Sequence, residues 1–527
     1  MSRSLEIREN LDPRQAAETD HSLIANDPSP KTRWLLWIGI ALATFLIAGA
    51  LFLAAWWPFT EATVIQQLEQ VTASTVEFGS FRRTYFPHVG CIAEKVTFRR
   101  VADPANPTVM TVERVTIQAS PAGLLTKHLS LIRMEGAHAV FAPLGTGPNW
   151  RPTSSKVVVD ELDANEALLQ FMRHDPRAPR VTFVIHKFLG HQLATPDPMQ
   201  FELQIKTPTP PGEVHVTGSF GPWNMNQVTE TPVSGEYSFR RADLGVFDGI
   251  EGILASDGQF HGPLDSIQID GTTATPDFNV KSAGRKVNLN SAFHAQVDAT
   301  NGDVTLDRVR AQILQTVVFS RGSIAQHRTE DGKTAAIDLD VRDGRIQDLL
   351  RLFVSAKQAP LNGAFNLKAR AFIPPGSQPF LQKLQMSGDF GVDNALFTKD
   401  ETQLSVDKLS AAGRGDGKQP DDPEMVVSDL QGHAVVKDGV ATFSVLRFRV
   451  PGARAKLHGT YDLASHRINL HGTLFMDAQL PKATSGVKSF LLKAINPFLK
   501  KNHRGGAEFP VGITGTYEAP SYFADPV

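Results

Sequence analysis

The feature that most constrains this chain is an uninterrupted apolar segment near its N-terminus. Residues 34–57 read WLLWIGIALATFLIAGALFLAAWW and contain no charged side chain. As an α-helix, a segment of this length spans about 36 Å, whereas the hydrocarbon core of a bilayer is about 30 Å thick. Tryptophans lie at both ends, where their rings favour the membrane interface. We therefore expect residues 34–57 to form a transmembrane helix.

A cleaved signal peptide is the alternative interpretation of this segment. The apolar region of a signal peptide usually has about 7–15 residues and lies close to the N-terminus. Here the apolar segment is longer, and residues 1–33 precede it. We therefore expect the helix to be retained as a membrane anchor.

The basic residues on either side of the segment predict its orientation. After the segment, no lysine or arginine appears until Arg82. The basic residues before it are Arg3, Arg8, Arg14, Lys31 and Arg33. The positive-inside rule then makes residues 1–33 a cytoplasmic tail, which we expect to lack regular structure, and places the body beyond the membrane. Cys91 is the only cysteine, so no internal disulfide can form, which suits a bacterial periplasm.

The body has the composition of a folded protein, with 41% hydrophobic and 20% charged residues. The formal net charge of −2 gives no long-range attraction to nucleic acid, so we exclude nucleic acid as a partner. Apolar residues alternate with polar ones over residues 95–101, 112–117 and 129–140, which is typical of strands with one solvated face. Helical spacing of apolar residues interrupts this pattern in a short segment after the anchor and at residues 346–353.

Turn dipeptides are frequent in the second half of the chain. We expect hairpin turns at Asp257-Gly258, Asp270-Gly271, Asn301-Gly302, Asp331-Gly332, Asn362-Gly363 and Asp438-Gly439. Residues 143–156 and 413–424 are rich in glycine and proline and are expected to be loops. The fold class that follows is mostly β: a long antiparallel meander with a few short helices after one N-terminal transmembrane helix.

Helical periodicity returns near the C-terminus, where residues 487–499 have one continuous apolar face. Pro497 should bend or shorten this helix. The segment either plugs the open end of the sheet or lies on a membrane surface. Because it lies within the folded chain and carries few lysines, we favour the plug and expect Phe490, Leu491 and Ile495 to be buried against the sheet.

Motifs that could carry chemistry are weak. Residues 389–391 read Asp-Phe-Gly, as in kinases, but no other kinase motif accompanies them and their surroundings alternate like a strand. Residues 413–418 resemble a phosphate-binding loop but lack its first glycine. The histidines lie singly and have no zinc-binding spacing. We therefore assign no catalytic, cofactor-binding or metal-binding residues and expect a protein that is not an enzyme.

Several segments of the C-terminal half carry a family resemblance: residues 435–474 (VVKDGVATFSVLRFRVPGARAKLHGTYDLASHRINLHGTL), SGVKSFLLKAINPFLKK, FPVGITGTYEAP and the central segment GPLDSIQIDGTTATPDFNV. In these segments the chain resembles the AsmA-like family of bacterial envelope proteins. The resemblance covers residues 235–522 closely and residues 34–142 loosely. It implies an anchor in the bacterial inner membrane and an elongated, bent antiparallel β-sheet, groove-like in form, with two β-rich regions, residues 59–234 and 235–527. It defines no catalytic residue.

The resemblance also implies a function. Such a protein would be a membrane-anchored periplasmic factor in envelope assembly, which handles or transfers phospholipid along an apolar groove of its sheet. Alternating residues suggest Phe443, Val445, Phe448 and Val450 as groove candidates, with a bend or bulge between the first pair and the second. A closed core built from the same alternation is the alternative structure. A scaffold that binds envelope proteins through exposed sheet edges is the alternative function.

Overall fold

Most of the chain beyond residue 58 is described by the structure, a computed structural model. The described residues are 44, 59–72, 74–99, 108–126, 128–141, 157–172, 180–193, 197–222, 224, 227–247, 249–281, 284–326, 332–354, 357–416, 420–478, 507–516 and 519–524. The chain divides into two units, Met1–Thr60 and Glu61–Val527. The second unit carries all the strands below.

The unit Glu61–Val527 is mostly β and forms one large, bent sheet. Its described residues include 27 strands. The first strands are β1 (Thr75–Glu77), β2 (Ser80–Thr84), β3 (Val89–Arg99), β4 (Thr108–Ala119), β5 (His128–Leu129), β6 (Leu131–Glu135), β7 (His138–Phe141), β8 (Val158–Phe171), β9 (Val181–Leu193), β10 (Met199–Pro208), β11 (Pro211–Phe220), β12 (Pro232–Asp243), β13 (Ile250–Glu251) and β14 (Ile253–Pro263). They are followed by β15 (Ile267–Val280), β16 (Val287–Asp298), β17 (Asp303–Ile313), β18 (Thr316–Gln326), β19 (Lys333–Arg345), β20 (Leu361–Ile373), β21 (Gln385–Phe397), β22 (Ser428–Lys437), β23 (Val440–Val450), β24 (Ala453–Asp462), β25 (Arg467–Met476), β26 (Ala507–Thr516) and β27 (Pro520–Ala524).

Within the described residues of the unit Glu61–Val527, the helices are few and short, as expected. They are α2 (Glu61–Thr72), α3 (Pro121–Thr126), α4 (Ile346–Phe353), α5 (Phe380–Lys383) and α6 (Asp400–Arg414), with 3-10 turns η1 (Val228–Glu230) and η2 (Leu244–Val246). α2 and α4 confirm the two helices predicted from apolar spacing. α6 was not predicted, and it includes the first two residues of the expected loop at 413–424.

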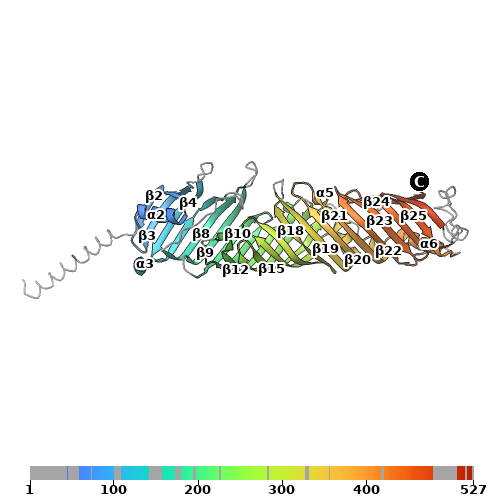
Figure 1. Ribbon diagram of the computed structural model, residues 1–527, viewed down its shortest axis with the longest axis horizontal. Helices are drawn as coiled ribbons and strands as arrows, with labels where there is room; N and C mark the ends of the chain where they lie inside the picture. Colours follow the sequence, from blue (N-terminus) through green and yellow to red (C-terminus); the bar gives the residue numbers. More distant parts are fainter. Residues whose placement is uncertain are drawn as a thin grey trace, which may run out of the picture. The chain divides into compact units, whose positions relative to one another are not determined.

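Strand order follows chain order almost throughout. From β8 onward each long strand pairs antiparallel with the next, so the strands succeed one another along the unit (Figure 1). The exception is β8, which pairs parallel with β5, β6 and β7. The sheet is therefore not purely antiparallel. The expected boundary between residues 234 and 235 falls within β12, and the expected loop at 143–156 lies outside the described residues.

Bulges recur along the sheet. The strands with one extra residue relative to a neighbour include β12, β15, β17, β19, β21 and β23. In β19 and β21 the bulge contains a residue with positive φ, Asp343 at 51° and Asn394 at 52°. Such bulges bend the strand and increase its twist. They account for the bending of the sheet.

Three of the six expected turns are wrong. Gly258, Gly271 and Gly363 lie within β14, β15 and β20, where their neighbours pair with adjacent strands. The turns at Asn301-Gly302 and Asp438-Gly439 are confirmed between consecutive strands. The remaining dipeptide includes Asp331, which lies outside the described residues.

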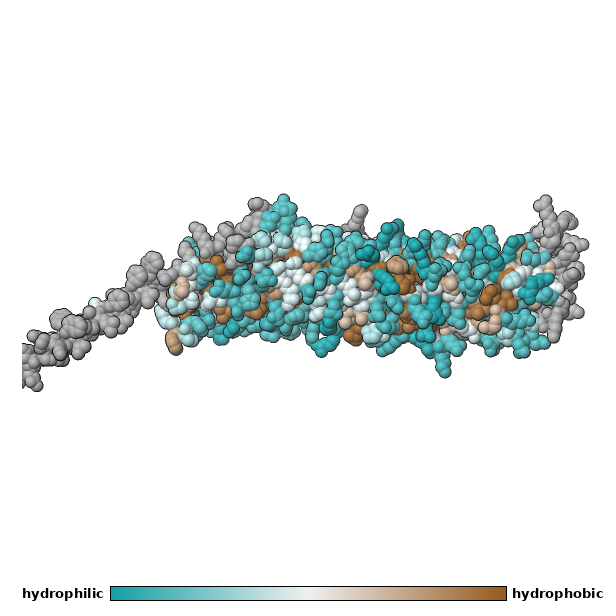
Figure 2. Space-filling view, turned by 90° about the horizontal axis from the view of Figure 1, so that it is seen from below, coloured by the Kyte–Doolittle hydropathy of each residue, from teal (hydrophilic) through white to brown (hydrophobic). Residues whose placement is uncertain are grey.

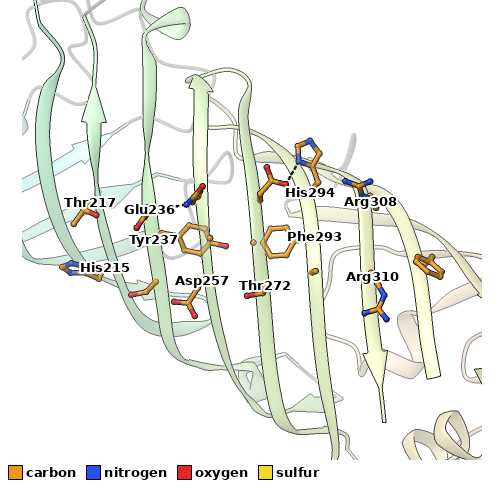
Figure 3. Close-up of a pocket in the computed structure, with 17 residues that line it drawn as sticks. His215, Thr217, Glu236, Tyr237, Asp257, Thr272, Phe293, His294, Arg308 and Arg310 are labelled. Atoms are coloured by element: carbon orange, nitrogen blue, oxygen red, sulfur yellow. Dashed lines mark hydrogen bonds and ion pairs between the residues drawn. The ribbon is translucent and has the colours of Figure 1, made fainter. Parts of the chain in front are cut away.

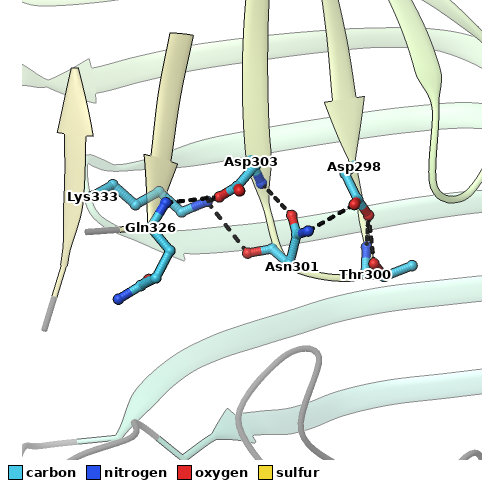
Figure 4. Close-up of polar contacts among 6 residues, drawn as sticks. All are labelled: Asp298, Thr300, Asn301, Asp303, Gln326 and Lys333. Atoms are coloured by element: carbon cyan, nitrogen blue, oxygen red, sulfur yellow. Dashed lines mark hydrogen bonds and ion pairs between the residues drawn. The ribbon is translucent and has the colours of Figure 1, made fainter. Parts of the chain in front are cut away.

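The turn at Asn301 is fixed by a polar network that reaches two further strands (Figure 4). Asp298 accepts hydrogen bonds from the Thr300 N–H at 2.8 Å and the Asn301 side-chain amide at 2.7 Å. Asp303 accepts from the Gln326 N–H at 3.0 Å and from Lys333 Nζ at 2.8 Å. The network ties the hairpin β16–β17 to β18 and β19.

The predicted anchor, residues 34–57, lies outside the described residues apart from Thr44, which is helical. Over the residues that are described, no helix combines the length and apolar character needed to cross a membrane.

Candidate functional site: the apolar face of the sheet

Residues that lie directly opposite each other on neighbouring strands share one face of a sheet. This rule gives continuous apolar rows across the C-terminal strands. One row contains Gly388, Ala434, Phe443, Gly459, Leu470 and Ile513. The next contains Phe390, Gly432, Leu446, Leu457, Gly472 and Val511, and the third contains Val392, Leu430, Phe448, Ala455, Leu474 and Phe509. We call this side of the sheet the apolar face.

Helices cover parts of the apolar face. Val406 and Ala412 of α6 belong to a buried cluster with Leu446, Val450 and Leu474 of the sheet. Residues of α4 pack in the same way against the ends of β15–β21. Each helix therefore closes a section of the face as an ordinary core.

α6 is held in place by buried polar side chains. Asp407, which is fully buried, accepts hydrogen bonds from the Glu424 N–H at 2.6 Å and the Val426 N–H at 2.9 Å. Gln403 donates to Asp407 at 2.8 Å and to the Val426 carbonyl at 3.0 Å. Because these groups satisfy one another away from water, they fix the position of the helix on the sheet.

The structure places three of the four groove candidates together. Val450 and Leu446 belong to the buried cluster that includes residues of α6, and Phe443 and Phe448 pack against this cluster while staying partly buried. Val450 is 3% exposed, whereas Phe443 is only partly buried. Val445 lies in the bulge of β23, which falls between Phe443 and Leu446. The bulge, after which the inward-facing positions shift by one residue, therefore lies before Leu446 and not between Val445 and Phe448 as expected. Leu446 takes the place of Val445 in the cluster.

Other sections of the apolar face are less covered. Leu306, Ile337 and Met386 lie in one row across β17–β21, together with Gly322 and Ala371. The three large side chains are only partly buried. Figure 2 shows separate hydrophobic patches, divided by hydrophilic surface, on one side of the described body. Large apolar side chains in the rows of the apolar face therefore stay partly accessible.

The opposite face is polar and carries a shallow trough of about 880 Å³ (Figure 3). Two rows of outward side chains line it; one of them contains Glu236, Gln259, Asp270, His294 and Arg308. Gln259 donates to Glu236 at 3.1 Å, and His294 Nδ1 lies 2.9 Å from Asp270. These pairs join neighbouring strands, which is typical of a solvated sheet face.

Charged groups along the polar face pair in the same way. Asp338 receives a hydrogen bond from Arg370 at 2.7 Å and lies 3.5 Å from Arg321. The hydrogen bond from Arg370 holds the pKa of the Asp338 carboxyl below its usual range. In the part of the chain that the structure describes, no three histidine, cysteine or acidic side chains gather as a metal site would require.

The remaining site prediction cannot be placed on the sheet. Phe490, Leu491 and Ile495 belong to residues 479–506, which lie outside the described residues. Their connection leaves β25 and enters β26 at paired positions, Met476 opposite Ala507. Burial of the three residues stays a prediction.

Comparison of the chain with family models, with curated proteins and with solved structures found no match.

Proposed function

We propose that this chain is a membrane-anchored, AsmA-like lipid-handling factor of the bacterial envelope, and that phospholipid acyl chains lie on the apolar face. The observation that carries the proposal is the row structure of that face: large aliphatic and aromatic side chains continue from strand to strand, and many stay partly exposed. Folded proteins seldom leave large apolar patches accessible without a ligand or partner.

The physical basis is the transfer of hydrocarbon out of water. Each methylene that leaves water for an apolar surface gains about 0.8 kcal/mol. The apolar face would keep acyl chains out of water while the polar headgroup stays at the hydrophilic margin of the sheet. Movement along this face needs no covalent chemistry, which agrees with the expectation that the chain is not an enzyme.

The test is native mass spectrometry of the full-length chain released from membranes in mild detergent. Phospholipid that remains bound after the detergent is stripped supports the proposal. Retention of the same lipid should fall in a variant with a charge on the apolar face and persist in one with a charge on the polar face. A chain that retains no lipid under any condition refutes it.

A scaffold that recruits envelope proteins is the second candidate, and the last strand favours it. Within the described residues, β27 pairs with β26 only from Val511 to Gly515, although β26 begins at Ala507. Unpaired backbone groups at a sheet edge can add a strand from another protein. In the same experiment, a protein bound in fixed stoichiometry without lipid would favour the scaffold.

A further inference from the structure

One section of the apolar face carries a group of neighbouring hydroxyl side chains. Ser256, Thr273 and Ser291 lie opposite one another on β14, β15 and β16 and therefore share this face. On β12, Phe239 lies opposite Ser256, and Tyr237, two residues away on the same face, adds a fourth hydroxyl. We call these four residues the hydroxyl cluster. The matching rows across β20–β25 are built from apolar residues and glycine, so the cluster is a local change in the chemistry of the face.

Tyr237 lies flat against the sheet because two glycines make room for it. A Cβ atom on Gly258 would come within 2.8 Å of the Tyr237 ring. A Cβ on Gly271 would come within 2.7 Å of both the Tyr237 hydroxyl and the Phe293 ring. Figure 3 shows these two rings side by side between the strands. The Tyr237 hydroxyl is thereby directed along the sheet toward Ser256, at 3.0 Å.

The protons of the cluster can be assigned from its hydrogen bonds. Ser256 Oγ donates to the Thr272 carbonyl at 2.9 Å, so Tyr237 donates to Ser256. Thr273 Oγ1 and Ser291 Oγ lie 2.6 Å apart, and only one of their two protons can lie between the oxygens. The other proton is left to an acceptor outside the pair. Thr273 and Ser291 are both half-buried, so such an acceptor can reach them.

The surroundings define which acceptor fits. The neighbouring side chains on this face include Phe260, Ile269, Phe293 and Leu289, and none of them is charged. A phosphate would need a cation here, whereas a neutral hydroxyl donor suits a carbonyl oxygen. A carbonyl joined to a long hydrocarbon chain is an acyl ester.

We propose that Thr273 and Ser291 form a subsite that donates a hydrogen bond to an ester carbonyl of an acyl lipid lying on the apolar face. This inference rests on the proposed function and adds a position at which the lipid is held by its glycerol-ester region. Lipids whose chains are attached by ethers lack this acceptor and lose the hydrogen bond.

The experiment compares two lipids on the full-length chain in detergent: a diacyl phosphatidylglycerol and its dialkyl ether analogue with the same chain lengths. In direct competition, the wild-type chain should prefer the diacyl lipid by about fivefold, the value of one ordinary hydrogen bond. The variant T273V/S291A should bind both lipids equally. Thr272→Val changes the same strand on the polar face and should keep the wild-type preference.

Each outcome is decisive. Equal binding of both lipids by the wild-type chain overturns the subsite while leaving lipid binding intact. A preference that survives in T273V/S291A also overturns it, because the selectivity then arises elsewhere. Absence of binding for both lipids removes the proposed function itself. Circular dichroism checks that the double variant is folded, and Thr273→Ala serves as a second variant if Thr273→Val disturbs the strand.

Discussion

Charged substitutions on β23 can distinguish two hypotheses for the apolar face: an accessible track for acyl chains and a closed core. Phe443 is partly buried on the apolar face, Val450 is 3% exposed beneath α6, and Thr442 is exposed on the polar face. The three variants Phe443→Asp, Val450→Asp and Thr442→Asp therefore place one carboxylate in three environments on a single strand.

The expected stability losses differ. An uncompensated charge at Val450 costs about 3–5 kcal/mol, a large part of the about 5–15 kcal/mol that stabilises a typical domain. At Phe443 the carboxylate can reach water, and the loss is limited to apolar burial and the edge-on contact with Phe390, whose ring centroid is 6.0 Å away. That loss is about 2 kcal/mol. Thr442→Asp should change stability by less than about 0.5 kcal/mol.

The expected effect on lipid movement is larger at Phe443. Neighbouring strands are about 4.8 Å apart, so an extended acyl chain places about four methylenes on each strand. Losing their contact at about 0.8 kcal/mol each raises the barrier to passage by about 3 kcal/mol, or about 150-fold in rate.

The assay is transfer of a fluorescent phospholipid from vesicles that hold the full-length chain to acceptor vesicles, with chemical denaturation as the measure of stability. Phe443→Asp should fold and lose transfer, and Thr442→Asp should behave as wild type. If Phe443→Asp unfolds as readily as Val450→Asp, the face is a closed core at this position. If it folds and transfers lipid normally, the track does not pass over Phe443.

Three further predictions follow from buried groups. Burial raises the pKa of the Cys91 thiol to about 12, so the thiolate is scarce at pH 8 and a maleimide should label Cys91 only as denaturant unfolds the chain. Gly271→Ala should destabilise by about 1–3 kcal/mol, because the new methyl meets Tyr237, whereas Gly391→Ala, whose Cβ has no neighbour nearer than 3.7 Å, should cost about 0.5 kcal/mol or less in denaturation experiments. Asp407→Ala removes the acceptor of the Glu424 and Val426 N–H groups and of the buried Gln403 amide, and should cost about 1–3 kcal/mol in the same measurement, with loss of the α6 contact to the sheet.

Period-two alternation was sufficient to predict a mostly β fold, and apolar spacing predicted α2 and α4. α6 was missed because its buried side includes Gln403, Asp407 and Ser410. These residues satisfy one another and nearby backbone groups, so the helix has no continuous apolar stripe in the sequence. Only the tertiary hydrogen bonds make those polar residues compatible with burial.

The incorrect turns at Gly258 and Gly271 have a related cause. Asp-Gly is a good turn signal when the glycine is needed for a positive φ. Here the glycines lie in regular strands, and their missing side chains accommodate the rings of Tyr237 and Phe293. An aromatic residue on an adjacent strand is the only sequence signal for this use of glycine, and register must be known to recognise it. The hydroxyl cluster was missed for the same reason, since its four members lie on four different strands.

The two faces of the sheet explain why the apolar rows stay partly open. Closing them as a core would require a second sheet or more helices, and the helices that pack there with large apolar residues in the described part of the chain, α4, α6 and Leu381 of the short α5, cover only sections of the face. The polar face cannot serve as that second layer for a neighbouring copy, because it carries paired charges such as Asp338 with Arg370 and Arg321, whose desolvation would be costly. The bulges bend the sheet but add no covering element. A ligand with hydrocarbon chains can remove the remaining apolar area from water without a further helix or a second sheet. A diacyl lipid does so while its charged headgroup stays in solvent. The sheet has one apolar and one charged face, and a diacyl lipid has apolar chains and a charged headgroup. The apolar face therefore favours a lipid as the molecule that covers it.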